Sequence, residues 1–143
     1  MQQEKISVEA LLAAGTPVQI HVPTNSMYQF IRPNRDEAII EPVEDAEKLR
    51  RGDVALYRRD GSILVLHRVW KVKDGAYYML GDNQAKAEGP IRPDQIRGVL
   101  AGIVRDGKTI RVTDPGYVLL SHLWLLMRPL RPIVWRLHRL IRR

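Results

Sequence analysis

Apolar and polar residues alternate in several short stretches of the chain. The clearest is Val18-Gln19-Ile20-His21-Val22, in which every second residue is apolar. A period of two is typical of a strand with one buried face, and short continuous apolar runs between turns are typical of a buried strand. The pattern predicts strands over residues 18–22, 37–40, 54–59, 63–72, 76–80, 96–104 and 109–112.

Three Asp-Gly pairs separate neighbouring strands, at Asp60-Gly61, Asp74-Gly75 and Asp106-Gly107. An Asp-Gly pair between two extended runs is typical of a two-residue hairpin turn. Strands joined in this way are antiparallel neighbours. The sequence therefore predicts a mainly β protein, either a small antiparallel barrel or a pair of packed sheets. Residues 85–93 are interpreted as a loop.

Helical patterns occupy the two ends of the chain. Residues 7–14 predict a short helix that Gly15 ends. After Asp114, residues 117–127 are rich in leucine, and the apolar residues of 133–143 fall on one face of a helix. We therefore expect a β domain over residues 1–114, with its core in 17–105, and a basic amphipathic helical tail over 115–143.

The positive charge of the chain is concentrated in this tail. The net charge is +7, and residues 115–143 contain six arginines but no lysine or acid. Removing these six from +7 leaves +1 for residues 1–114. The basic balance therefore gives no reason to expect nucleic-acid binding by the β domain. The chain has no cysteine, which excludes disulfides and cysteine nucleophiles.

Three interpretations are open for residues 117–143. The segment can pack on the β domain as a helical hairpin, lie on an anionic membrane surface, or bind nucleic acid. Its arginines and its two tryptophans, Trp124 and Trp135, favour the membrane surface. No signal peptide and no apolar run long enough to span a bilayer is visible, so we expect a cytoplasmic or peripheral membrane protein.

Candidate chemistry begins at Ser26, which follows the predicted strand 18–22. A serine hydroxyl needs a neighbouring base to act as a nucleophile, and histidine suits this task. His67 lies in the predicted strand 63–72, and Asp82 follows the next strand, where it could orient the imidazole. The backbone N–H of Ser26 and the hydroxyl of Thr24 are candidates for an oxyanion hole.

Four short motifs extend this hypothesis to most of the β domain. They are Thr24-Asn25-Ser26-Met27, Arg51-Gly52-Asp53-Val54, Leu66-His67-Arg68-Val69 and Gly81-Asp82-Asn83. Their identity and order resemble the conserved boxes of type I signal peptidases, which belong with the LexA-like peptidases in one serine-peptidase clan. The resemblance covers about residues 17–105.

The resemblance implies a signal peptidase-like β fold and a serine endopeptidase that cleaves a signal or leader peptide. Ser26 would be the nucleophile and Thr24 would help to form the oxyanion hole. A histidine at position 67 is similar to the endoplasmic-reticulum and archaeal branch, whereas most bacterial members have lysine there. In the histidine branch the third residue often follows the last box, which makes Glu88 the runner-up to Asp82.

Two residues beside Ser26 depart from the family pattern, because Asn25 and Gln29 stand where glycine and proline are usual. Gln29 lacks the fixed φ of proline. We expect Met27 and Phe30 to line the peptide cleft, and the resemblance implies no metal or cofactor. The alternative hypothesis is a non-catalytic peptide-binding or regulatory module on the same scaffold.

Overall fold

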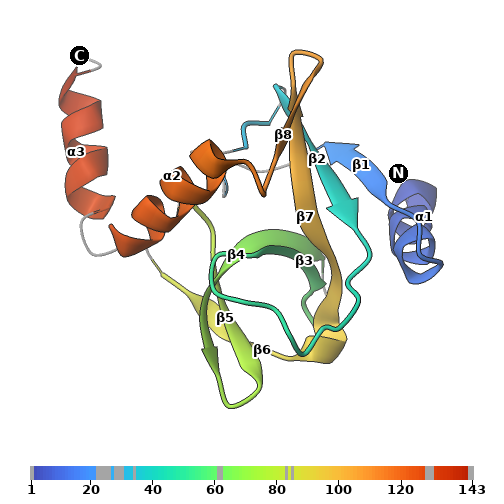
Figure 1. The fold of residues 1–143 in the computed structure, drawn as a ribbon. Helices are drawn as coiled ribbons and strands as arrows, with labels where there is room; N and C mark the ends of the chain where they lie inside the picture. Colours follow the sequence, from blue (N-terminus) through green and yellow to red (C-terminus); the bar gives the residue numbers. More distant parts are fainter. Residues whose placement is uncertain are drawn as a thin grey trace.

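The computed structural model describes residues 2–21, 27, 31–33, 35–60, 63–82, 84, 86–127 and 131–141. Within these ranges the protein is mainly β and antiparallel, which confirms the predicted fold class (Figure 1). The strands are β1 (Val18–His21), β2 (Asp36–Glu41), β3 (Val54–Arg58), β4 (Leu64–Lys73), β5 (Ala76–Leu80), β6 (Glu88–Ile91), β7 (Ile96–Arg105) and β8 (Lys108–Arg111).

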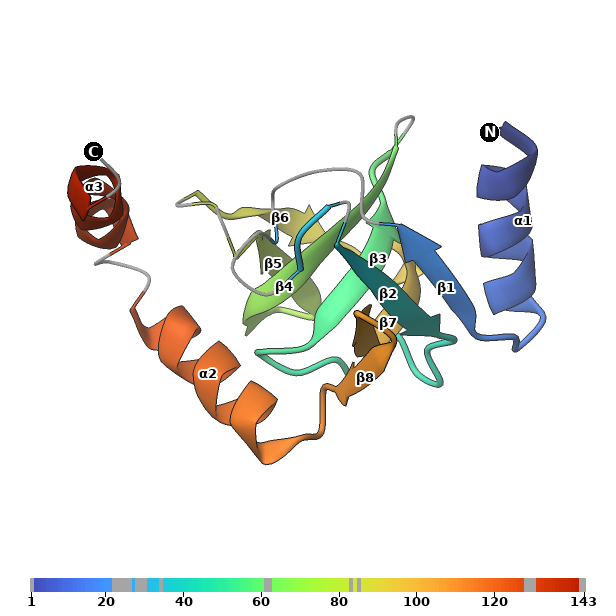
Figure 2. The same cartoon turned by 90° about the horizontal axis from the view of Figure 1, so that it is seen from above.

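The strands form one strongly curved sheet in the order β1-β2-β7-β3-β4-β5-β6, with β8 paired to β7. Strand β7 therefore lies between β2 and β3, although it follows both in the sequence by many residues. Strands β1 and β6 end the series, so the sheet stays open and does not close into a barrel (Figure 2).

Two of the predicted hairpin turns are present. Asp74 and Gly75 have φ values of 53° and 74°, and Asp106 and Gly107 have values of 52° and 75°. Positive φ at both central residues matches the right-handed twist of the flanking strands, and Asp and Gly tolerate it. The third pair, Asp60-Gly61, lies partly outside the described residues.

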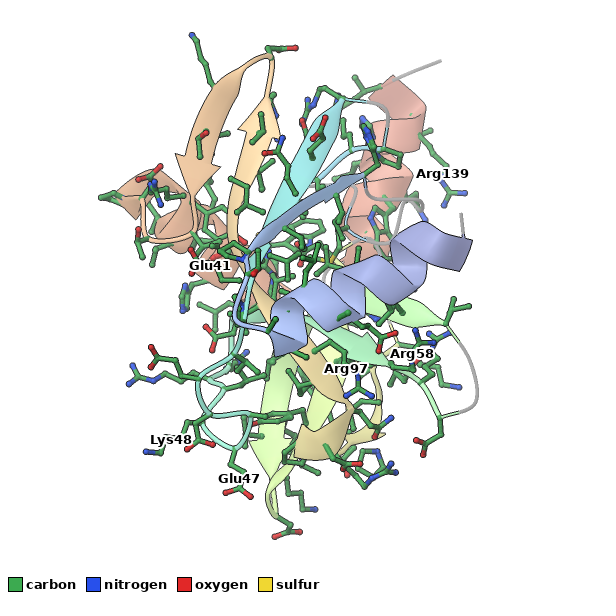
Figure 3. The ribbon with its side chains drawn as sticks, turned by 90° about the vertical axis from the view of Figure 1, so that its right-hand side faces the viewer. Glu41, Glu47, Lys48, Arg58, Arg97 and Arg139 are labelled. Atoms are coloured by element: carbon green, nitrogen blue, oxygen red, sulfur yellow. The ribbon has the colours of Figure 1, made fainter. Side chains whose placement is uncertain are left out.

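Helix α1 (Gln2–Ala13) begins earlier than predicted and covers one end of the sheet (Figure 3). Leu12 is buried in the core, and Glu9 forms ion pairs with Arg58 of β3 and Arg97 of β7. Gly15, at φ 87°, ends the helix and turns the chain into β1. Val8 and Leu12 pack on the core, and the Glu9 carboxylate pairs with two sheet strands, so that α1 is attached to the sheet by both apolar and charged contacts.

Strands β3 and β4 contribute side chains to two separate hydrophobic clusters. Successive side chains of a strand point to opposite faces. One cluster contains Val54, Leu56 and Leu66 together with Met27, Leu12 and residues of β2 and β7. The second contains Ala55, Tyr57, Val65, Val69, Tyr77 and Met79. The β3–β4 hairpin is therefore buried on both sides, as its nearly continuous apolar sequence indicates.

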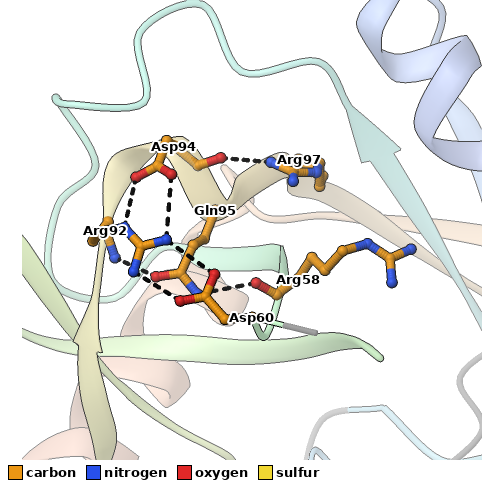
Figure 4. A network of polar contacts seen from close by, with 6 residues as sticks. All are labelled: Arg58, Asp60, Arg92, Asp94, Gln95 and Arg97. Carbon is orange, nitrogen blue, oxygen red and sulfur yellow. Dashed lines mark hydrogen bonds and ion pairs between the residues drawn. The ribbon is translucent and has the colours of Figure 1, made fainter. Parts of the chain in front are cut away.

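Strand β6 and the 3-10 helix η1 (Pro93–Gln95) replace part of the loop predicted over 85–93. Arg92 pairs with Asp60 and Asp94, and Gln95 donates to the carbonyl of Arg58 at 3.0 Å (Figure 4). These contacts fix the corner at which the chain leaves β6 and enters β7. The ion pairs of Arg92 are largely exposed to solvent.

Two helices follow β8: α2 (Pro115–Leu126) and α3 (Arg131–Ile141). They lie at the opposite end of the molecule from α1, and α3 projects furthest from the sheet (Figures 1 and 2). Helix α2 buries Ser121 and Leu125. In the part of the chain that the structure describes, no helix has the length and apolar character needed to cross a bilayer.

Candidate active site

The predicted site residues divide into two groups. Thr24, Ser26 and Phe30 lie outside the described residues, as do Asn25 and Gln29. The described residues include Met27, the candidate base His67 and both candidate acids, Asp82 and Glu88.

Arg68 and Asp82 form a completely buried ion pair. Arg68 Nε donates to Asp82 Oδ1 at 2.7 Å, and Nη2 donates to Oδ2 at 2.6 Å, while both side chains are 0% exposed. Two parallel charge-assisted bonds of this kind are strong and geometrically specific. The carboxylate beside Arg68 holds the pKa of the guanidinium above its usual value against the effect of burial.

Described residues of all four sequence motifs meet around this pair. Arg68 Nη1 donates to the carbonyl of Gly52 at 3.0 Å, and the backbone N–H of Asp82 contacts the sulfur of Met27 at 3.4 Å. The backbone of Val69 is bonded on both sides, to Gly52 and to Asp53. Segments separated by up to 55 residues in the sequence are thus joined in one motif cluster.

Met27 belongs to the protein core in this structure. Its side chain is 0% exposed and packs in the cluster that includes Leu12 and Ile40. A side chain without exposed surface cannot line a peptide cleft, so the prediction that Met27 contacts substrate is corrected. Its sulfur packs against the backbone of Asp82 instead.

His67 lies on the opposite face of β4 from Arg68. It pairs with Ala55 across the sheet and shares the face of Tyr57, and Nδ1 is 3.0 Å from the Tyr57 hydroxyl. Within the described part of the chain, this is its only hydrogen bond. The predicted contact between Asp82 and His67 is therefore not made, because Asp82 is held by Arg68 on the other face.

Tyr57 connects His67 to Glu88, the runner-up acid. The Tyr57 hydroxyl donates to Glu88 Oε1 at 2.9 Å, and Arg59 Nη2 lies 2.5 Å from Glu88 Oε2. Glu88 pairs with Met79 in the sheet, which places it on the same face as His67 and Tyr57. Strand β4 supplies His67, β3 supplies Tyr57 and β6 supplies Glu88. These three residues form a hydrogen-bonded His67–Tyr57–Glu88 series.

This series fixes the protonation pattern of His67. An ionised carboxylate only accepts hydrogen bonds, so the single Tyr57 proton is donated to Glu88. The tyrosine oxygen must then accept a hydrogen bond from the Nδ1–H group of His67. The remaining nitrogen, Nε2, carries the lone pair, which is the arrangement that a general base needs.

The surroundings set the ionisation of the three groups. Burial lowers the pKa of His67 to about 4, aided by Arg59 and partly offset by Glu88. Burial and the neighbouring Glu88 raise the pKa of Tyr57 above its usual value. Burial alone would raise the pKa of Glu88, but hydrogen bonds from Arg59 and Tyr57 lower it below its usual value. At neutral pH, His67 and Tyr57 are therefore neutral and Glu88 is ionised.

Helix α2 covers the motif cluster on the side of Arg68. The Trp124 indole donates to the carbonyl of Asp82 at 2.6 Å, and the Tyr117 hydroxyl accepts from Arg68 Nη2 at 3.2 Å. The tail is therefore in direct contact with the motif cluster through α2.

Two hollows among the described residues border the motif cluster, because Asp53 lines one of them and Arg51 lines the other. One, of about 530 Å³, lies between residues 41–53 and strands β7 and β8, and a smaller one of about 240 Å³ lies between Arg51 and α2. None of the lining residues is His67, Asp82 or Glu88. These hollows do not mark the place where the candidate chemistry is assembled.

Sequence reasoning missed Tyr57 and assigned no role to the side chain of Arg68. A signal for Tyr57 exists, because it is a tyrosine in an apolar strand that is the hairpin neighbour of the histidine strand. A buried tyrosine hydroxyl usually has a hydrogen-bond partner. Arg68 in an apolar strand likewise requires a buried acid, and Asp82 provides it.

Comparison of the chain with protein-family models, with curated proteins and with solved structures finds no significant match. The signal peptidase resemblance therefore depends on the four motifs.

Proposed function

We propose that this protein is a serine endopeptidase that resembles signal peptidases and cleaves a signal or leader peptide by Ser-His chemistry. The observation that carries the proposal is the orientation of His67. Its Nδ1 is engaged by Tyr57, and Nε2 is left with a lone pair. A neutral imidazole in this tautomer is suited to accept a proton from a serine hydroxyl.

In the proposed mechanism, Ser26 attacks the scissile carbonyl and His67 Nε2 accepts its proton. The Ser26 backbone N–H and the Thr24 hydroxyl stabilise the oxyanion. His67 then donates the proton to the leaving amine, and a water molecule hydrolyses the acyl-enzyme in the second half of the reaction. Phe30 would contribute to the peptide cleft.

Glu88 acts as a positioning residue through Tyr57 in this mechanism. When His67 gains a proton, its positive charge is stabilised by the ionised Glu88 through the intervening hydroxyl. Glu88 therefore replaces Asp82 as the acid of the proposed triad. Asp82 is assigned the separate task of holding Arg68 and the motif segments together.

The motif cluster supports the resemblance to signal peptidases. The four motifs are short and weakly specific one by one, and described residues of each of them are in contact with one another or with Arg68 and Asp82. Met27, which follows the candidate nucleophile in the sequence, is one of the contacting residues. A chance set of motifs has no reason to meet in space.

Peptide cleavage by the full chain tests the proposal. The wild-type protein is incubated with fluorogenic peptides that carry an Ala-x-Ala site, and cleavage products are mapped by mass spectrometry. Ser26→Ala and His67→Gln should each lower the cleavage rate by about 1,000-fold or more, since members of such a unit act together. Ser121→Ala and His21→Gln are the matched controls and should cleave at the wild-type rate.

A cleavage rate that Ser26→Ala leaves unchanged would refute the proposed nucleophile. Thermal unfolding of each variant excludes loss of fold as the cause of inactivity. Equal loss in the Ser121→Ala control would show that the assay reports stability rather than chemistry.

A second candidate function is a non-catalytic peptide-binding module. It is favoured by the burial of His67, which is 3% exposed, and by its position on the face of β4 opposite to Arg68 and Asp82. Specific binding of the same peptides without cleavage, by wild type and by Ser26→Ala alike, would support this function and exclude the peptidase.

A further inference from the structure

Helix α2 carries leucines on the face that it does not bury. Leu119, Leu120, Leu123 and Leu126 are 45% to 66% exposed, and their spacing places them on one side of the helix. The opposite side packs against the protein through Leu125 and Trp124. A helix that is apolar on all sides is normally covered on all sides. The outer leucine face of α2 therefore requires a further apolar environment.

Helix α3 carries a second uncovered apolar face. Ile133, Leu137, Leu140 and Ile141 are 54% to 83% exposed and follow one another at helical spacing. Arg136 and Arg139 lie outside this stripe and are exposed to solvent. Arg139 extends from α3 to the outside of the molecule in Figure 3. The helix thus combines an open apolar face with a cationic one.

The charge of the tail indicates what covers these faces. Residues 115–143 contain six arginines and no acid or lysine. An interfacial helix has an apolar face that enters the acyl region and a cationic face at the headgroups. A second copy of the chain would bring a second set of arginines to the same surface, which repel the first set.

We propose that α2 and α3 together bind an anionic lipid surface. The outer leucines of α2 and the stripe of α3 insert at the headgroup boundary, and the arginines pair with lipid phosphates. Because the inner side of α2 contacts Arg68 and Asp82, binding also places the motif cluster beside the lipid surface. This proposal does not depend on peptidase activity.

Vesicle flotation of the full chain tests the proposal. The protein is mixed with vesicles of equal parts phosphatidylglycerol and phosphatidylcholine, and with vesicles of phosphatidylcholine alone. We expect flotation with the anionic vesicles, with weaker binding at high salt and on neutral vesicles. Ser26→Ala should float as well as the wild type, which separates lipid binding from catalysis.

Two variants test the two components of the surface. Leu119→Gln/Leu123→Gln/Leu126→Gln should weaken binding more than about 100-fold, because three leucines no longer enter the apolar layer. Arg136→Gln/Arg139→Gln should weaken it about 30-fold and reduce its salt dependence, because each cation near an anionic surface contributes about fivefold.

The matched controls replace side chains of similar exposure elsewhere. Ile63 and Val72 are exposed apolar residues of the sheet region, and Lys73 and Lys108 are exposed cations there. Ile63→Gln/Val72→Gln and Lys73→Gln/Lys108→Gln should bind vesicles like the wild type. Because all these positions are exposed, each variant is expected to keep the wild-type unfolding temperature.

Two results would overturn the proposal. One is wild-type flotation by the leucine variant. The other is a wild-type protein that binds neither kind of vesicle and sediments as a dimer, while the leucine variant sediments as a monomer. This outcome would show that a second copy of the chain covers the apolar faces.

Discussion

The two faces of β4 carry different buried chemistry, although His67 and Arg68 are adjacent in the sequence. On one face, Arg68 and Asp82 form a paired charge with two direct hydrogen bonds. On the other, a neutral His67 reaches an ionised Glu88 only through the hydroxyl of Tyr57. The first arrangement is a direct ion pair, whereas the second contains a neutral imidazole that can exchange a proton.

This difference separates structural from chemical tasks within one strand. A buried ion pair resists any change in charge, because loss of either partner leaves an uncompensated charge in the core. A buried histidine with a low pKa stays neutral at physiological pH and releases a gained proton readily. The comparison predicts that substitutions on the two faces affect stability and titration differently.

The largest effect is expected from Asp82→Asn on the Arg68 face. The buried guanidinium would lose its counter-charge, and the free energy of unfolding should fall by about 3–5 kcal/mol. Denaturant unfolding measures this change. Arg68→Met/Asp82→Leu, which removes both charges, should recover part of the loss. Equal destabilisation by the single and the double variant would show that the contacts to Gly52 and Tyr117 matter more than the charge pair.

The next effect is a pH dependence that arises on the His67 face. The pKa of His67 is lowered from 6.5 to about 4 in the folded protein, so between these values only the unfolded chain binds the proton. Stability should therefore fall as the pH is lowered from about 6.5 to 4 and change no further through this group below pH 4. The full contribution is about 3 kcal/mol.

His67→Gln provides the control for this prediction, because it removes the titrating group. Its unfolding free energy should change much less between pH 6.5 and 4 than that of the wild type. Glu88 acts at lower pH: its lowered pKa contributes stability above its usual value of 4.5, which is lost as the pH falls further. A wild-type profile that is flat down to pH 4.5 would contradict the low pKa of His67.

Tyr57→Phe sharpens the comparison at the level of single hydrogen bonds. It removes the hydroxyl between His67 and Glu88 and leaves buried polar groups without partners, which should cost about 1–3 kcal/mol. Nitrogen chemical shifts of the imidazole should show the Nδ1–H tautomer in the wild type and a shift toward Nε2–H in the variant. An Nε2–H tautomer in the wild type would contradict the assigned donor pattern.

The smallest effect is expected from Arg92→Gln at the exposed corner before β7. Its pairs with Asp60 and Asp94 lie in solvent, where ion pairs are screened and contribute little (Figure 4). The unfolding midpoint should stay within experimental error. A clear loss of stability would show that η1 and its polar contacts fix the position of β7 more firmly than exposure indicates.

Much of the sheet could be predicted from residue periodicity. Strand β5 is found at its predicted bounds, and the ends of the other predicted strands differ by at most one residue. Strand β6 was missed because its sequence, Glu88-Gly89-Pro90-Ile91, contains glycine and proline and has no apolar alternation. It is an edge strand held by its neighbour β5, a tertiary contact that local sequence does not report.

The site was predicted less completely because register decides which face each side chain occupies. Asp82 follows the hairpin neighbour of the histidine strand, so proximity to His67 was a reasonable expectation. However, Arg68 pairs with Leu80, and Asp82 lies two residues further on the same face. A shift of one residue exchanges the faces. His67 is consequently turned toward Glu88, whose strand was not expected.

The position of β7 in the sheet has a consequence for how the chain assembles. Strands β1 and β2 join the rest of the sheet through β7, which is the seventh strand to be synthesised. The β3–β4–β5 meander can pair locally, whereas the first two strands must wait for a segment more than fifty residues away. Folding is thus governed by a late, non-local closure, which is slow compared with hairpin formation. During synthesis, the motif segments remain without a complete sheet until residues 96–105 have left the ribosome.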